Sequence, residues 1–229
     1  MPGYKIAYPM VSADARRAGF NGVALGGRQV YGVVADAECI QGPRHRCPSS
    51  WCDCGFYCFH ERDEARALAC DPQYAHSVVL DVLCSGRFFR YERGLRYARQ
   101  TVRGVRVGRC DCGRSGAAFA GAPTGVVGWR RLVPVCASCA GVRPVLTFAT
   151  FGRLAGEPGA PLEVRTDEGV EDAVFTNLAG GTTGDAPEPW SDGLDDAARV
   201  SLLSAEVALL QARLDDVQSR LERLTRRAD

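Results

Sequence analysis

Two groups of closely spaced cysteines constrain this chain more than any other feature of its sequence. Residues 47–60, CPSSWCDCGFYCFH, hold four cysteines and one histidine, in a chain with eleven cysteines and three histidines. An odd number of cysteines cannot all pair within one molecule, and the first residues, MPGYKIAYPMVSADARR, lack the basic-then-apolar order of a secretory signal. We therefore expect a cytoplasmic protein with reduced thiols, in which clustered cysteines favour metal ligation over disulfides.

The first candidate metal site lies between residues 39 and 60. Its CDCG motif, residues 52–55, is typical of a knuckle, in which backbone amides point at two thiolates and a glycine allows the tight turn. Tetrahedral zinc takes four soft or borderline donors, and this segment offers seven. The candidates are Cys39, His45, Cys52 and Cys54, with Cys47, Cys58 and His60 as competing ligands.

A resemblance favours one set among these seven. The succession of AEC-x5-H, CDCGFY and VVLDVLCSGRFFRYERGLRYA resembles an uncharacterised cysteine/histidine module of actinobacterial proteins, over about residues 30–100. In that module a cysteine, a histidine before a proline, and a C-x-C-G-aliphatic-Tyr knuckle precede a helix and two strands. The resemblance implies zinc ligation by Cys39, His45, Cys52 and Cys54, and no particular activity. Here Cys47 stands between His45 and Pro48, which departs from the pattern.

The second candidate metal site has the pattern C-x-C-G-x23-C-x2-C, formed by Cys110, Cys112, Cys136 and Cys139. Two knuckles at strand ends, separated by a loop of this length, resemble a zinc ribbon. Four protein ligands leave no open coordination position for a reacting water. The sequence therefore predicts two zinc ions per chain with a structural role.

Enzymatic patterns are not found. A zinc deaminase would carry a histidine–x–glutamate pair, whereas Glu61 follows His60 directly. No glycine-rich phosphate loop stands between a strand and a helix. We therefore expect a protein that is not an enzyme.

The charge is unevenly distributed along the chain. Residues 1–151 carry 20 basic and 11 acidic side chains, whereas residues 152–229 carry 8 and 16. Residues 87–114 alternate arginines with aromatic residues, which suits phosphate contacts and base stacking. A solvated strand face above an aromatic core would give the same mixture. The candidate nucleic-acid contacts are Arg87, Arg90, Arg93, Arg96, Arg99, Arg103 and Arg106.

The pattern along the chain predicts an α+β fold, with a small, mostly antiparallel β region stabilised by zinc. Strands are expected within residues 18–35, 77–109, 128–135 and 144–151, a short helix after Phe59, and a loop over residues 113–125. No apolar run approaches the roughly 20 residues that span a bilayer, so no membrane association is expected. We place this domain at residues 1–151 and an acidic, glycine- and proline-rich linker at residues 152–193.

Residues 194–229 predict a coiled coil that forms a homo-oligomer. Apolar residues recur at alternating spacings of three and four, which is a heptad seam. A dimer is favoured, with a trimer or tetramer as alternatives. The seam consists of Val200, Leu203, Val207, Leu210, Leu214, Val217, Leu221 and Leu224.

These features together favour a non-catalytic adaptor or regulatory scaffold, in which the coiled coil presents several copies of a basic zinc module to a protein partner. The first alternative is a nucleic-acid-binding regulator that uses the arginine-rich strand face. The second is a redox sensor that releases zinc when its thiolates are oxidised.

Overall fold

The computed structural model describes residues 1–23, 29–42, 44–157 and 159–167. The expected coiled coil at residues 194–229, with its whole heptad seam, lies outside these residues, as does most of the expected linker. Within the described residues no helix is long and apolar enough to cross a membrane.

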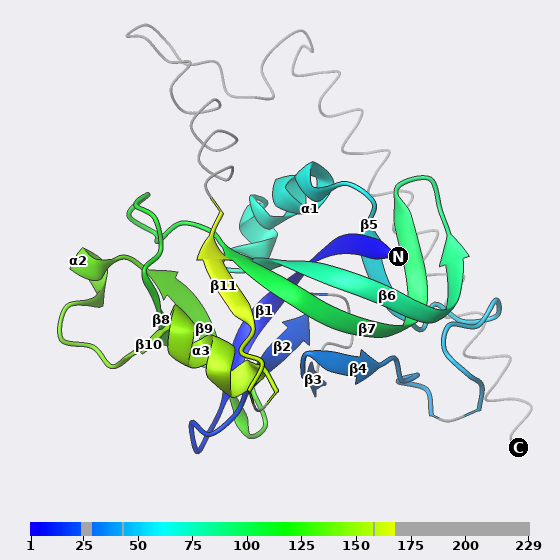
Figure 1. Ribbon diagram of the computed structural model, residues 1–229, viewed down its shortest axis with the longest axis horizontal. Helices are drawn as coiled ribbons and strands as arrows, with labels where there is room; N and C mark the ends of the chain where they lie inside the picture. The colour runs from blue at the N-terminus through cyan, green and yellow to red at the C-terminus, as the bar shows by residue number, and fades with distance from the viewer. Residues whose placement is uncertain (24–28, 43, 158, 168–229) are drawn as a thin grey trace, which may run out of the picture. The chain divides into compact units, whose positions relative to one another are not determined.

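Within the described residues, eleven strands form one sheet, and three short helices and one 3-10 turn lie against it (Figure 1). All the strand pairings are antiparallel except that of β11 with β7. The elements are β1 Pro2–Ser12, β2 Ala18–Gly22, β3 Val30–Tyr31, β4 Val34–Asp36, β5 Phe56–Phe59, α1 Arg62–Ala69, the 3-10 turn Pro72–Tyr74, β6 Val78–Arg90, β7 Gly94–Val107, β8 Ala118–Val126, β9 Trp129–Val135, α2 Ala137–Ala140, β10 Val145–Thr147, α3 Phe148–Ala155 and β11 Glu163–Thr166. The expectation of a mostly antiparallel β fold is confirmed, and α1 is the short helix expected after Phe59, whereas α2 and α3 were not expected.

Strand β7 is the centre of this sheet. One of its edges pairs with β6, and the other pairs in turn with β5, β4 and β11. Strand β6 also pairs with β1, and β1 pairs with β5 through Tyr4 and Phe59. The pairing β1–β6–β7–β5–β1 therefore closes on itself, which lets side chains of several strands converge on one core.

The main core is built from alternate residues of the strands and from one face of α3. Phe20, Tyr97, Phe119 and Phe151 are fully buried, and the Phe151 ring lies 5.8 Å from Phe20 and 5.0 Å from Phe119, between ring centroids. A smaller core lies on the other side of β1, where Ala65 of α1 packs near Ile6. Both sides of β1 are thus covered, which explains why it is buried along most of its length.

The structure corrects two expected elements. The expected loop over residues 113–125 contains β8, because Ala118, Phe119 and Ala120 are buried and pair in register with β9. The glycines and the proline that suggested a loop coincide with a register shift between Gly121 and Gly125. The expected strand over residues 144–151 is only partly a strand: β10 ends at Thr147, whose side chain accepts a hydrogen bond from Thr150 N and caps α3.

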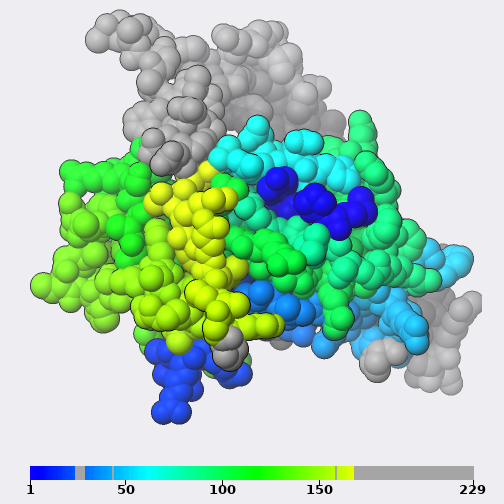
Figure 2. Space-filling view, in the orientation of Figure 1, coloured from blue at the N-terminus to red at the C-terminus, as the bar shows by residue number. Residues whose placement is uncertain are grey.

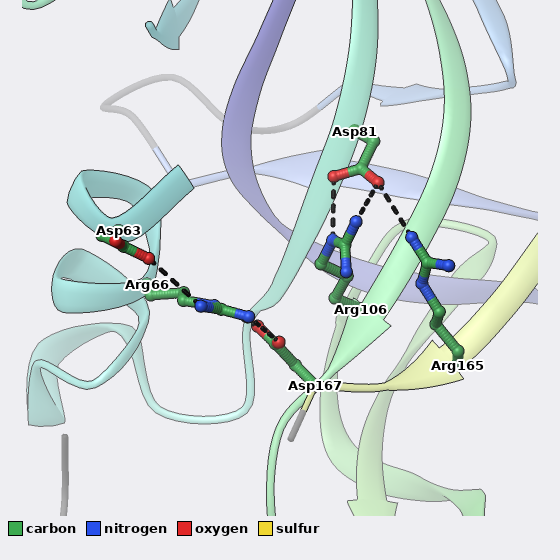
Figure 3. Close-up of polar contacts among 6 residues, drawn as sticks. All are labelled: Asp63, Arg66, Asp81, Arg106, Arg165 and Asp167. Carbon is green, nitrogen blue, oxygen red and sulfur yellow. Dashed lines mark hydrogen bonds and ion pairs between the residues drawn. The ribbon is translucent and has the colours of Figure 1, made fainter. Parts of the chain in front are cut away.

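The folded region also extends past the expected boundary at residue 151. Helix α3 crosses that boundary, and β11 adds a parallel strand beside β7. This part of the chain is visible on the face of the molecule shown in Figure 2. Ion pairs fix this extension (Figure 3). The buried Asp167 carboxylate accepts hydrogen bonds from Arg66 of α1. The Asp81 carboxylate accepts two hydrogen bonds from Arg106, of 3.0 and 2.8 Å. The guanidinium of Arg165 in β11 lies 3.6 Å from the same Asp81 carboxylate.

The main core contains one buried amine. Lys5, the only lysine of the chain, is 8% exposed, and its Nζ lies 4.6 Å from the ring centroid of Phe56 and 5.0 Å from that of Tyr31. Its one hydrogen bond among the described residues goes to Gln100 Oε1, at 3.3 Å. Burial lowers the pKa of Lys5 from 10.5 to about 8, because the charged form is poorly solvated there.

The variant Lys5→Met should be more stable than the wild type at pH 7. Between pH 8 and pH 10.5 the unfolded chain binds the Lys5 proton more tightly than the folded chain, so the free energy of unfolding rises with pH across this window. Below pH 8 the full cost of burying the charge is present, roughly 3 kcal/mol for a shift of this size. Gln100 keeps the Tyr97 hydroxyl as its donor in the variant.

Urea unfolding of both proteins at pH 7 and near pH 10.5 measures this difference. We expect the variant to gain about 1–3 kcal/mol at pH 7, and to lose this advantage at the higher pH. A difference that does not change with pH would contradict the account of Lys5.

Candidate metal centres

The first cluster lies in the segment that joins β4 to β5. Cys39 follows β4, and Cys52 and Cys54 lie just before β5, so the sheet fixes both ends of the segment. The ligand atoms of Cys39, His45, Cys52 and Cys54 all lie within 4.8 Å of one another. The structure therefore brings together the four residues of the expected first site.

The distance between two thiols of this cluster fits a tetrahedral metal ion, and a thiol–imidazole distance is somewhat shorter than such an ion requires. Two thiolates bound to one ion at 2.3 Å lie about 3.8 Å apart, and a thiolate and an imidazole nitrogen about 3.5 Å apart. Cys39 Sγ lies 3.7 Å from Cys52 Sγ, and His45 Nε2 lies 3.1 Å from Cys54 Sγ. Gly55, which ends the knuckle, has φ +127°, in the left-handed range that favours glycine.

Arg96 of β7 supports the first knuckle through hydrogen bonds to backbone carbonyl oxygens. Its guanidinium donates to the carbonyl oxygens of Cys52, at 2.6 Å, and of Ser49, at 3.0 Å, and Arg96 is buried. The Phe89 ring centroid lies 4.9 Å from the guanidinium carbon. Arg96 therefore fixes the backbone next to a ligand and places a positive charge near a site rich in thiolates.

The three competing ligands of the first site lie outside this cluster of four. Cys47 contacts the Cys54 thiol, and this hydrogen bond, together with the larger effect of burial, raises the pKa of Cys54 to about 11. Cys58 is buried in the main core, with its Sγ 3.4 Å from Cys84 Sγ. His60 Nε2 lies 3.2 Å from the carbonyl oxygen of Tyr91.

The second cluster joins the segment after β7 to the end of β9. The ligand atoms of Cys110, Cys112, Cys136 and Cys139 all lie within 4.8 Å of one another, and Cys112 Sγ lies 3.5 Å from Cys136 Sγ. Gly113 has φ +82° and follows Cys112, as Gly55 follows Cys54. Both C-x-C-G motifs therefore form the glycine-dependent turn that the sequence predicts.

Backbone amides stabilise thiolates in the second cluster. Cys136 caps α2, and its Sγ accepts a hydrogen bond from Cys139 N at 3.4 Å. This hydrogen bond is the largest of the effects that lower the pKa of Cys136 to about 6. A thiol with such a pKa is mostly thiolate at neutral pH, which is the form that binds metal.

Arginines surround the second cluster. Arg114 donates to Ser138 Oγ at 2.8 Å. This bond joins the turn that holds Cys110 and Cys112 to the one that holds Cys136 and Cys139. Arg143 donates to the carbonyl oxygen of Cys139. Arg109 donates to the carbonyl oxygen of Gly113. These cations offset the negative charge of four thiolates.

Most of the arginines expected to contact nucleic acid make contacts within the chain. Arg93 pairs with Glu64 at 2.6 Å, Arg99 with Asp36 at 2.8 Å and Arg106 with Asp81 at 2.8 Å. Arg96 supports the first knuckle, and Arg87 donates to the carbonyl oxygen of Pro48 at 3.4 Å. Arg90 and Arg103 are both exposed.

The two clusters are compatible with two metal sites, one with three sulfur ligands and one nitrogen ligand, and one with four sulfur ligands. They lie near opposite ends of β7. Arg96, close to the start of this strand, donates to the carbonyl oxygen of Cys52 in the first cluster, and Cys110 of the second cluster follows the end of the strand. The support from Arg96 was not predicted. A single arginine within a β strand carries no local signal that distinguishes a buried contact from a solvated one.

The variant Arg96→Met should release metal from the first cluster faster than the wild type. Removing a group that orients a metal ligand typically costs 10- to 100-fold in metal affinity, so we expect at least about a tenfold faster transfer of one ion to a chelating dye. The second ion should leave at the wild-type rate. Arg99→Met removes an exposed arginine of the same strand and is the control; equal release rates for the two variants would contradict the role of Arg96.

No protein-family model matches this chain, and no curated protein or solved structure is significantly similar to it. Of the resemblance to the cysteine/histidine module, the structure supports two clusters that could bind metal, and it identifies no family. The function of the chain must therefore be inferred from its own residues.

Proposed function

We propose that both clusters bind zinc and that the protein is a non-catalytic, oligomeric adaptor or regulatory scaffold of the cytoplasm. Cysteine and histidine ligands in tetrahedral spacing are the donors that zinc takes in structural sites. Each cluster supplies all four ligands, which leaves no position for a substrate or a reacting water. A closed site of this kind stabilises a binding surface and carries out no chemistry.

The observation that carries this proposal is a fully exposed tryptophan on the first knuckle. Trp51 is 95% exposed, and it lies in the turn between Ser49 and Cys52, which are joined by a β-bridge. Arg96 bonds to the carbonyl oxygens of both residues that flank this turn, and Cys52 is in the cluster. Ile40, next to Cys39, is 78% exposed.

An exposed tryptophan on a fixed turn suits a protein partner. Tryptophan is enriched among the residues that contribute most to protein–protein binding, and a turn held in place loses little conformational entropy when it binds. We propose that Trp51 enters an apolar pocket of the partner. The metal ligands and Arg96 would then act by presenting this side chain.

Nucleic-acid binding is the alternative, and the arginine contacts weigh against it. A strand face that contacts phosphates needs arginines whose charge is available, whereas Arg93, Arg99 and Arg106 are each paired with a carboxylate. Arg90 of β6 and Arg103 of β7 are the exceptions, since both are exposed and neither belongs to an ion pair of the described residues. Redox sensing is the other alternative, motivated by Cys112, which is exposed in the second cluster.

Affinity capture with the full-length protein, in extract of the cells that produce it, tests the role of Trp51. The variant Trp51→Ser should lose at least about tenfold in bound partner, as expected when an interface tryptophan is removed. Val127→Ser is the matched control, because Val127 is also fully exposed but lies in the turn between β8 and β9.

Three outcomes of this capture would contradict the adaptor proposal. Equal capture by wild type and Trp51→Ser would remove Trp51 from the interface. A bound component that nuclease removes, and that salt displaces steeply, would favour nucleic acid. Loss of both the partner and the zinc after a mild peroxide pulse would favour the redox sensor.

Oligomerisation through the heptad seam at residues 194–229 is part of the same proposal. The double variant Leu210→Asp and Leu214→Asp should be a monomer, because two charges would enter the apolar seam of each helix. Ala208→Asp and Ala212→Asp add the same charge away from the seam and should leave the oligomer intact. Light scattering gives the mass of each protein; an unchanged oligomer for the seam variant would show that the contact lies elsewhere.

A further inference from the structure

A cavity opens into the main core at the place where β1 changes its partner. Residues 7–11 of β1 pair with β2, and Tyr4 pairs with Phe59 of β5. Among the described residues, neither Lys5 nor Ile6 pairs with a strand on that edge. The resulting cavity has a volume of about 720 Å³, which is within the range of small-molecule sites.

The cavity is lined mainly by apolar residues, with the Lys5 amine among them. The apolar and aromatic side chains include Val30, Tyr31, Phe56 and Leu95. The Lys5 ammonium lies within 5.0 Å of the ring centroids of both Tyr31 and Phe56. A mainly apolar lining with a few charged groups is the usual composition of a site that binds and orients a small molecule.

The Lys5 ammonium has no carboxylate partner among the described residues. It has three N–H donors, and its one hydrogen bond within the described residues goes to the neutral Gln100 side chain. The thiols of Cys58 and Cys84 act on it electrostatically and raise its pKa, but the opposite effect of burial is larger. A buried charge without a carboxylate partner is costly, and its pKa of about 8 leaves it mostly protonated at neutral pH.

The other residues that line the cavity limit the charge of a ligand. Asp36, Glu38 and Arg93 also line it. The two carboxylates would repel a second negative charge, and the charge of Arg93 is paired with Glu64 at 2.6 Å. Asp36 is paired with Arg99, and Glu38 accepts a hydrogen bond from Gln29 at 3.1 Å. The site therefore suits a single negative charge on an apolar body better than a phosphate.

We propose that this cavity binds a small apolar monocarboxylate, whose carboxylate accepts hydrogen bonds from Lys5 and whose apolar part lies against Tyr31, Phe56 and Leu95. None of the eight cluster residues lines the cavity, although Gly55 at the end of the first knuckle does, and the proposal does not depend on the adaptor function. The ligand supplies a carboxylate partner for Lys5, which the described residues do not provide.

Octanoate and its uncharged analogue 1-octanol test this proposal with the full-length, zinc-loaded protein. Because Lys5 is the only lysine of the chain, labelling with ¹³Cε-lysine gives one NMR signal from the proposed binding group. Octanoate should shift this signal in a saturable way, and an equal concentration of octanol should shift it much less. Titration calorimetry at pH 7 should show octanoate bound at least about tenfold more tightly than octanol, as expected for hydrogen bonds to a charged group.

Two variants make the assignment specific to Lys5. Lys5→Met should lose at least about tenfold in affinity for octanoate and keep its affinity for octanol. Arg103→Met removes an exposed cation outside the cavity and should bind both as the wild type does. A lysine signal that octanoate leaves unmoved would overturn the proposal without any variant, and so would equal octanoate affinities of wild type and folded Lys5→Met.

Discussion

The convergence of four cysteine or histidine side chains at each end of β7 is the constraint on which the rest of this structure depends. Four thiols and imidazoles within 4.8 Å of one another have little reason to stay together unless they share a cation, since ionised thiolates repel. The segment between β4 and β5 and the segment after β7 have few buried apolar side chains of their own. Metal ligation would supply the energy that fixes them, on the order of 10–16 kcal/mol for zinc in finger peptides.

Arginine contributes to this architecture mainly inside the molecule. Arg96 supports the first knuckle, Arg106 joins β7 to Asp81 of β6, and Arg66 holds the buried Asp167 beyond the last strand. The planar guanidinium suits this role because it can donate two parallel hydrogen bonds to one carboxylate or reach two carbonyl oxygens. The positive net charge of residues 1–151 therefore overstates the charge that is free to attract a partner.

Lys5 presents the opposite case, a charge that is buried without a carboxylate partner among the described residues. A methionine or leucine of similar volume would pack in the same place without the cost of desolvation. Such a cost is typical of functional sites, where stability is reduced to keep a reactive or binding group in position. The cavity beside Lys5 gives a physical reason for its presence, and it is separate from the surface that carries Trp51.

The ligand set of the second cluster and the strands within residues 77–109 could be predicted from local patterns in the sequence. C-x-C-G indicates a knuckle through its glycine, but the first segment offered seven ligands, and only the resemblance favoured the four that cluster. Strand β1 was not predicted. Strand β8 could not be predicted, because Ala118 and Ala120 become core residues only through pairing with β9. The same holds for β11 and Asp167, whose partners β7 and Arg66 are distant in sequence. The cavity at Lys5 also depends on long-range pairing, since it arises where β1 passes from β2 to β5.

Native mass spectrometry of the purified protein tests the central claim most directly, because it counts the metal ions on each folded chain. We expect two zinc ions per chain in the wild type, and one in each of the variants Cys52→Ala and Cys112→Ala, which remove a ligand from one cluster each. A folded wild-type protein without zinc, or one that keeps both ions in either variant, would contradict the account.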